Sequence, residues 1–213
     1  MRVTTFAMLF ALLISAGARA DERIDRVLAV VNGNVITESD VRAALAFGLV
    51  RPPRAGADPI RATLDQLIRR ELILREVARS TSEESAPERV QAALDAIRAR
   101  FASRAEYEAR LAQTAMDETR LRDMIEADIL VEDYLQQRFG AVAEPSESEI
   151  ASYYQAYRAD FASGGRQLSL DEAKPVVRER LLEERRRQIV DDWVARLRRR
   201  AEVTDVYFAA AAK

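Results

Sequence analysis

The chain has 213 residues, 48% of them hydrophobic and 32% charged, with a formal net charge of −2. It contains no His and no Cys, which excludes disulfides, thiol nucleophiles, Ser-His-Asp triads and the usual zinc sites. A weakly acidic chain lacks the clustered cationic surface that nucleic-acid binding requires. We therefore expect no nucleic-acid partner, and we predict no cofactor and no metal. The few Gly and Pro residues favour a mainly helical protein.

Residues 1–20 have the pattern of a secretory signal peptide. Arg2 precedes an apolar run at 6–16, and Ala18-Arg19-Ala20 is a small-x-small cleavage site. The run is too short to span a bilayer. We predict cleavage after Ala20 and no stable membrane insertion, with an uncleaved anchor as the alternative. Removing Arg2 and Arg19 would change the formal charge from −2 to −4.

Residues 24–41 predict a strand, a tight turn, a second strand and the start of a helix. Val27 to Val31 is a β-branched and aliphatic run, and Asn32-Gly33 tolerates the positive φ angles of a two-residue hairpin turn. Thr37 is a candidate N-cap, and acidic residues follow it in the first helical turn. A lone hairpin is only marginally stable, so we expect the β-rich segment at 202–208 to lie beside it and complete one small sheet.

This segment, DRVLAVVNGNVITESDV, resembles the opening motif of the SurA-type periplasmic chaperones and the wider parvulin-foldase family. The matching positions are Asp25, Ala29, Val30, Val31, Asn32, Ile36, Thr37, Ser39 and Asp40. The resemblance implies a periplasmic location. It also implies a chaperone module in which the chain ends meet in one antiparallel sheet.

The middle of the chain predicts a series of amphipathic helices. Apolar residues recur at helical spacing in 38–47, 59–79, 86–101 and 117–139. Ser103, followed by Glu three residues later, predicts a capping box that opens one more helix.

Ser146 and Glu149 predict another capping box, and an aromatic face follows it. That helix resembles the one that precedes the isomerase domain in the parvulin-foldase family. Here the segment at 168–173 already resembles the part that follows the isomerase. The isomerase domain is therefore missing, and no catalytic residue is carried over.

The last helix is predicted at 169–201. Its apolar face has one group near the start, Val177 and Leu181, and one near the end, Ile189, Trp193 and Leu197. The stretch at 183–187 is wholly charged, so we expect it to bridge solvent between two packed ends. Pro175 would cost a hydrogen bond, so the helix would start later or kink there.

These observations predict one mainly α domain at 21–208, a multi-helix chaperone module with a small antiparallel sheet. Its helical part is 38–161. The segment at 169–208 packs back on the hairpin at 26–37, and 209–213 is a tail.

The resemblance implies a holdase that binds unfolded polypeptides, including outer-membrane proteins, without isomerase activity. Such binding needs an adaptable apolar surface with a charged rim. The candidate client-binding residues are Met116, Met124, Tyr134, Tyr153, Tyr154, Tyr157 and Phe161. Stripes of this kind more often mark helix packing, so burial in the core is the competing interpretation.

Two other functions stay open. An adaptor would bind one specific folded partner, and client breadth separates it from a holdase. An enzyme is disfavoured, because the pairs Glu83-Glu84 and Asp191-Asp192 point in different directions and no glycine-rich phosphate loop is present. A homodimer would bury apolar surface that we assign to clients.

Overall fold

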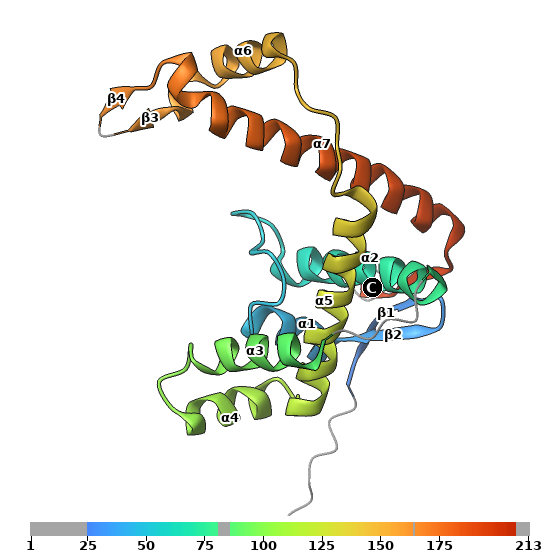
Figure 1. Ribbon diagram of the computed structural model, residues 1–213. Helices are drawn as coiled ribbons and strands as arrows, with labels where there is room; N and C mark the ends of the chain where they lie inside the picture. Colours follow the sequence, from blue (N-terminus) through green and yellow to red (C-terminus); the bar gives the residue numbers. More distant parts are fainter. Residues whose placement is uncertain (1–24, 81–85, 164, 208–213) are drawn as a thin grey trace, which may run out of the picture.

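The computed structural model describes residues 25–80, 86–163 and 165–207, so the predicted signal peptide at 1–20 and the tail at 209–213 lie outside it. The described chain is mainly helical and has one three-stranded antiparallel sheet. Figure 1 shows a body of helices around this sheet, with one long helix that carries the segments 147–169 away from it. The predicted fold class is confirmed.

The sheet forms as expected from the turn chemistry. β1 (Val27–Val31) and β2 (Asn34–Thr37) pair antiparallel across Asn32-Gly33, whose φ angles are 49° and 93°. β5 (Val203–Asp205) pairs antiparallel with the other edge of β1, with Val31 opposite Val203. β1 is therefore the central strand, and the two ends of the described chain meet there.

Five helices and the C-terminal end of a sixth form the body together with the sheet. They are α1 (Glu38–Ala46), α2 (Pro59–Ser80), α3 (Pro87–Arg98), α4 (Arg104–Gln113) and α5 (Glu118–Phe139), joined by the C-terminal part of α7. α2 contacts α1, α5, α7 and the sheet. One hydrophobic cluster runs through all of these elements, so α3 and α4 share the core of the body.

Caps fix the helix starts where the sequence predicts them, with one difference. Thr37 and Ser146 each form a capping box, with Asp40 and Glu149 respectively. At α4 the Ser103 hydroxyl accepts from the Glu106 amide, but the Glu106 carboxylate accepts from Ala102 N–H at 3.0 Å. The predicted reciprocal box is therefore shifted by one residue at this helix.

A second, smaller cluster lies at the far end of α7 (Leu170–Arg200). It joins α6 (Glu147–Ala156), the start of α7 and Phe161, which follows the short 3-10 helix η1 (Arg158–Asp160). Strands β3 (Ala162–Ser163) and β4 (Arg166–Gln167) form a hairpin there that the sequence analysis missed. We call α6, η1, β3, β4 and the first part of α7 the arm.

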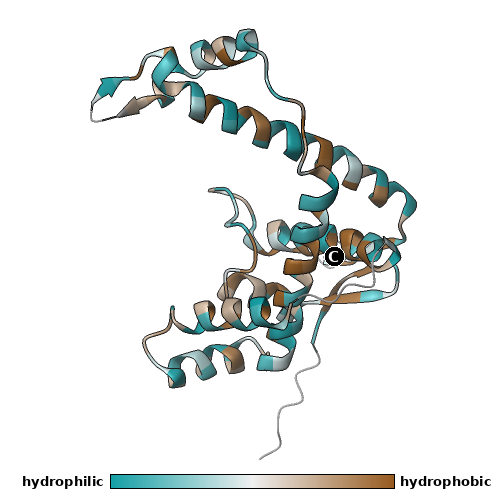
Figure 2. Ribbon diagram, in the orientation of Figure 1, coloured by the Kyte–Doolittle hydropathy of each residue, from teal (hydrophilic) through white to brown (hydrophobic). Residues whose placement is uncertain are grey.

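α7 connects the arm to the body as a single helix. Of its residues, none between Val177 and Val190 is buried, in agreement with the predicted solvent-bridging middle. The helix begins at Leu170 with Pro175 inside it, so it does not start later. Ile189 is 44% exposed, and Val190 packs into the core in its place. Figure 2 shows hydrophobic residues gathered at the sheet and hydrophilic ones along much of α7.

Candidate functional site

An open groove lies at the end of the body where α3, α4 and the start of α5 meet. Its volume is about 760 Å³, and it is lined by Arg98, Ala99, Phe101, Ser103, Arg104, Tyr107, Glu108, Leu111 and Glu118. These residues come from the last turn of α3, the short α3–α4 loop, one face of α4 and the first residue of α5. We call it the α3–α4 groove.

An aromatic cluster supports the floor of this groove. The rings of Phe101 and Tyr107 have centroids 5.6 Å apart in an edge-on arrangement, and both lie close to Phe47 from the end of α1. Leu111 is 9% exposed and sits one helical turn beyond Tyr107. Edge-on ring packing holds such side chains rigid. The floor is therefore a preformed apolar surface.

Charged groups pair with one another around this floor. Glu118 accepts hydrogen bonds from Arg98 at 2.5 Å and from the Tyr107 hydroxyl at 3.1 Å. The hydrogen bond from Arg98 is the main reason that the pKa of Glu118 is lowered. The pKa of Tyr107 is raised, first by burial of its hydroxyl and then by the neighbouring Glu118 carboxylate. Arg104 and Glu108 form a second, exposed pair at 2.7 Å. The rim thus carries charge in matched pairs and leaves no unpaired carboxylate over the apolar floor.

Five of the seven predicted client-binding residues belong to the hydrophobic cores. Met116, Met124 and Tyr134 are buried in the body. Tyr154 and Phe161 are buried in the arm, where the Tyr154 hydroxyl donates to the Leu168 carbonyl at 2.5 Å. Their packing matches the competing core interpretation, and none of the five lines the α3–α4 groove.

The other two predicted residues lie at the surface of the arm. Tyr157 is 50% exposed, and its ring centroid is 4.6 Å from that of Tyr153. The Tyr153 hydroxyl donates to Glu184 at 3.0 Å, which orients this ring against α7. The pair presents an aromatic surface on the arm, and neither tyrosine lines the α3–α4 groove of the body.

Three polar contacts hold the arm and its linker onto α7. Arg185 donates to the Ala143 carbonyl at 2.6 Å and pairs with Glu149 at the start of α6. Arg186 donates to the Gly140 carbonyl at 3.0 Å. The linker between α5 and α6 is therefore attached to the charged middle of α7, which sets the direction of the arm.

The described residues were also compared with the requirements of a metal site and of a membrane span. Within 25–80, 86–163 and 165–207, no group of three or more Asp or Glu side chains is placed to hold a metal ion. In the same residues, no helix has the length and apolar character needed to cross a membrane.

Sequence reasoning missed the groove residues, although it predicted the helices at 86–101 and after Ser103 that carry many of them. Helical spacing identifies an apolar stripe but does not say which part of the stripe a neighbouring helix leaves uncovered. The short α3–α4 loop was the available signal, because it keeps the two helices side by side and exposes the end of their shared apolar face. The chain matches no family model and no curated protein.

Proposed function

We propose that this protein is a SurA-type holdase chaperone of the periplasm, which binds unfolded polypeptides, including outer-membrane proteins, without isomerase activity. The observation that carries the proposal is the α3–α4 groove, an open apolar hollow with an ion-paired rim. The resemblance of residues 24–41 to the chaperone motif, and the signal-like pattern at 1–20, support the location.

The groove suits an unfolded polypeptide for physical reasons. Its volume of about 760 Å³ lies within the ordinary range of ligand pockets. Burial of apolar surface is non-directional, so a groove of this kind accepts many side chains. The floor offers the rings of Phe101 and Tyr107 rather than a polar pattern that would select one sequence.

The tyrosine pair on the arm, with Tyr157 exposed and Tyr153 partly buried, adds a second contact surface for the same client. Tyr153 lies in α6 and Tyr157 at its C-terminus, so both belong to the arm, whereas the groove lies in the body (Figure 1). Two weak contacts on one flexible chain reinforce each other, because binding at the first raises the effective concentration at the second. This explains how a holdase would retain a long client with modest contact areas.

The test is suppression of aggregation by the purified protein. A urea-unfolded outer-membrane porin and an unrelated unfolded soluble protein are diluted separately into buffer, and light scattering is followed. Suppression of both at near-stoichiometric ratios is expected. No effect on either client would overturn the holdase function, and capture of a single folded partner in a pull-down would then favour an adaptor.

A matched pair of variants tests the groove itself. Ala99 is exposed, lines the groove and has ordinary helical φ and ψ, so Ala99→Glu puts a charge at the apolar surface without disturbing the core. Ala96 is exposed on the same helix outside the groove, so Ala96→Glu is the control. We expect Ala99→Glu to weaken suppression several-fold and Ala96→Glu to behave as wild type. Equal activity of both variants would exclude this groove.

A further inference from the structure

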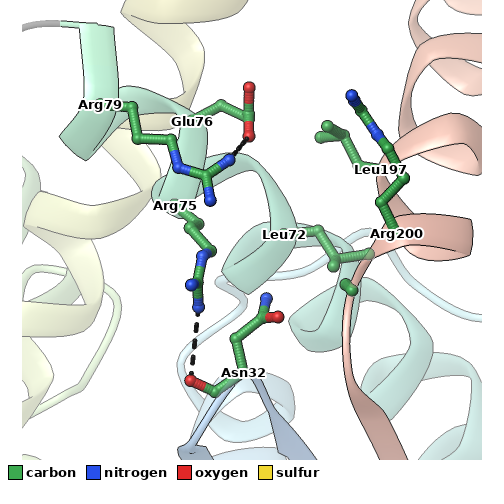
Figure 3. Close-up of a pocket in the computed structure, with 8 residues that line it drawn as sticks. Asn32, Leu72, Arg75, Glu76, Arg79, Leu197 and Arg200 are labelled. Atoms are coloured by element: carbon green, nitrogen blue, oxygen red, sulfur yellow. Dashed lines mark hydrogen bonds and ion pairs between the residues drawn. The ribbon is translucent and has the colours of Figure 1, made fainter.

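A second hollow lies on the body where the end of α2, the end of α7 and the β1–β2 turn meet (Figure 3). Its volume is about 280 Å³, and its lining residues are Asn32, Leu72, Arg75, Glu76, Arg79, Leu197, Arg200 and Ala201. None of them lines the α3–α4 groove. We call it the arginine pocket.

The arginine pocket carries an excess of positive charge. Three guanidinium groups line it, against the single carboxylate of Glu76, which accepts from Arg79 at 2.7 Å. Arg75 donates to the Asn32 carbonyl at 3.4 Å. Within the part of the chain that the structure describes, no carboxylate pairs with Arg75 or Arg200. This local excess occurs in a chain whose formal net charge is −2.

The donors approach the pocket from opposite sides. Figure 3 shows Arg75 and Arg79 on α2 at one side, Arg200 on α7 at the other, and the Asn32 side chain between them. The Asn32 amide oxygen accepts from Glu202 N–H at 3.2 Å, which leaves its amide N–H₂ group as a donor toward the pocket. Leu72 and Leu197, 3% and 5% exposed, form an apolar floor.

We propose that the arginine pocket binds a small phosphate group. Guanidinium forks match phosphate oxygens in geometry, and charge-assisted hydrogen bonds of this kind are stronger than neutral ones. A phosphate monoester carries a charge of roughly −1.5 to −2 at pH 7, which matches the excess of two positive charges among the lining residues. The small volume limits the ligand to one phosphate with a short substituent. A free phosphate compound and a lipid headgroup share this chemistry.

The first experiment titrates the full protein with inorganic phosphate at constant ionic strength, followed by calorimetry and by backbone amide shifts in NMR. Saturable binding is expected, with shifts at Asn32 and in the last turns of α2 and α7. Phosphatidic acid vesicles are compared with phosphatidylcholine vesicles in a second arm. Selective binding to the acidic vesicles would assign the lipid source, and binding of free phosphate alone would assign a soluble compound. Binding to neither would overturn the proposal.

Arginine variants provide the matched comparison. Arg75→Gln and Arg200→Gln each remove one lining guanidinium that pairs with no carboxylate of the described residues, whereas Arg199→Gln removes a neighbouring exposed arginine that does not line the pocket. We expect the first two to weaken phosphate binding about tenfold each, and Arg199→Gln to leave it within about twofold. An equal loss of phosphate binding in all three variants would mean that phosphate responds only to the overall charge of the surface, and would overturn the proposed pocket. Ala99→Glu should leave phosphate binding unchanged, so this site and the chaperone groove are tested separately.

Discussion

Arg120 donates two hydrogen bonds to a single oxygen of Asp40, from Nε at 3.0 Å and from Nη2 at 2.7 Å. The other Asp40 oxygen accepts from the amide and the hydroxyl of Thr37, both at 2.9 Å. One carboxylate therefore caps α1 and joins it to α5, 80 residues later. Next to it, Asp25 accepts from the amide of Ser39 at 3.1 Å and from its hydroxyl. Since the Thr37 and Ser39 hydroxyls lie 3.0 Å apart, Asp25, Thr37, Ser39 and Asp40 of the opening motif form one connected network.

Asp40→Ala is expected to lower the free energy of unfolding by about 2 kcal/mol, because it removes the carboxylate half of the α1 capping box and leaves Arg120 without this partner. Urea unfolding followed by circular dichroism measures this loss. The control is Asp123→Asn, since Asp123 is exposed on α5 and makes no hydrogen bond or ion pair with the described residues. Similar midpoints for the two variants would contradict a structural role for the network.

Ile150→Ala is expected to destabilise the arm while leaving the body intact. Ile150 is 1% exposed in the small cluster, and truncating a buried aliphatic side chain costs about 3 kcal/mol. Hydrogen exchange of the α6 amides should accelerate. The single Trp, Trp193, packs against Tyr134 and Phe139 in the body cluster, so its fluorescence reports the body. Its urea midpoint should stay unchanged.

Leu121→Ala serves as the reciprocal variant, because Leu121 is fully buried in the body. It should lower the Trp193 midpoint. If Ile150→Ala lowered that midpoint to the same extent, the two hydrophobic clusters would unfold as one unit.

Acid should release the N-terminal caps of the arm. The pKa of Glu172 is lowered from its ordinary value of 4.5 to about 2, chiefly by Arg166 and then by the Ser169 groups. The pKa of Glu149 is also lowered to about 2, chiefly by the Ser146 hydroxyl. Since both values are below those of the unfolded chain, this stabilisation is complete above pH 4.5. It is lost as the pH falls from about 4.5 to about 2.

Hydrogen exchange at the starts of α6 and α7, recorded across that pH range, measures the effect. Glu172→Gln should speed exchange at the start of α7 at neutral pH and remove part of its acid dependence. Glu179→Gln is the control, because Glu179 is exposed on α7 and has no ion pair with a described residue. An unchanged acid profile in Glu172→Gln would rule out this carboxylate as the titrating cap.

Pro175→Ala is expected to stabilise the arm by about 1 kcal/mol. Proline has no N–H, so the helical hydrogen bond to the Asp171 carbonyl cannot form, and alanine restores it. Slower hydrogen exchange in the first turns of α7 would show the gain. Val176→Ala is the comparison, because this neighbouring side chain is 44% exposed and its truncation should change little. Faster exchange in Pro175→Ala would contradict the prediction.

The sequence predicted those features that depend on nearby residues. Asn32-Gly33 identified the hairpin turn, and Ser146 with Glu149 identified the start of α6, because turn and cap chemistry is decided within a few residues. The strand near the C-terminus was assigned to the hairpin because an isolated two-stranded sheet needs a partner. The β3–β4 hairpin was missed, since each strand has two residues and no apolar alternation marks it.

Only the tertiary structure decided which apolar residues remain accessible. Met116 and Tyr154 have the same character in sequence as Phe101 and Tyr157, yet the first two are buried while Phe101 lines an open groove and Tyr157 is half-exposed. Burial depends on how distant segments meet, as when Arg185 attaches the α5–α6 linker to α7. The same holds for the arginine pocket, whose lining residues come from three parts of the chain. Local pattern determined the helices, the three-stranded sheet and most of the caps, and the long-range packing determined the surfaces.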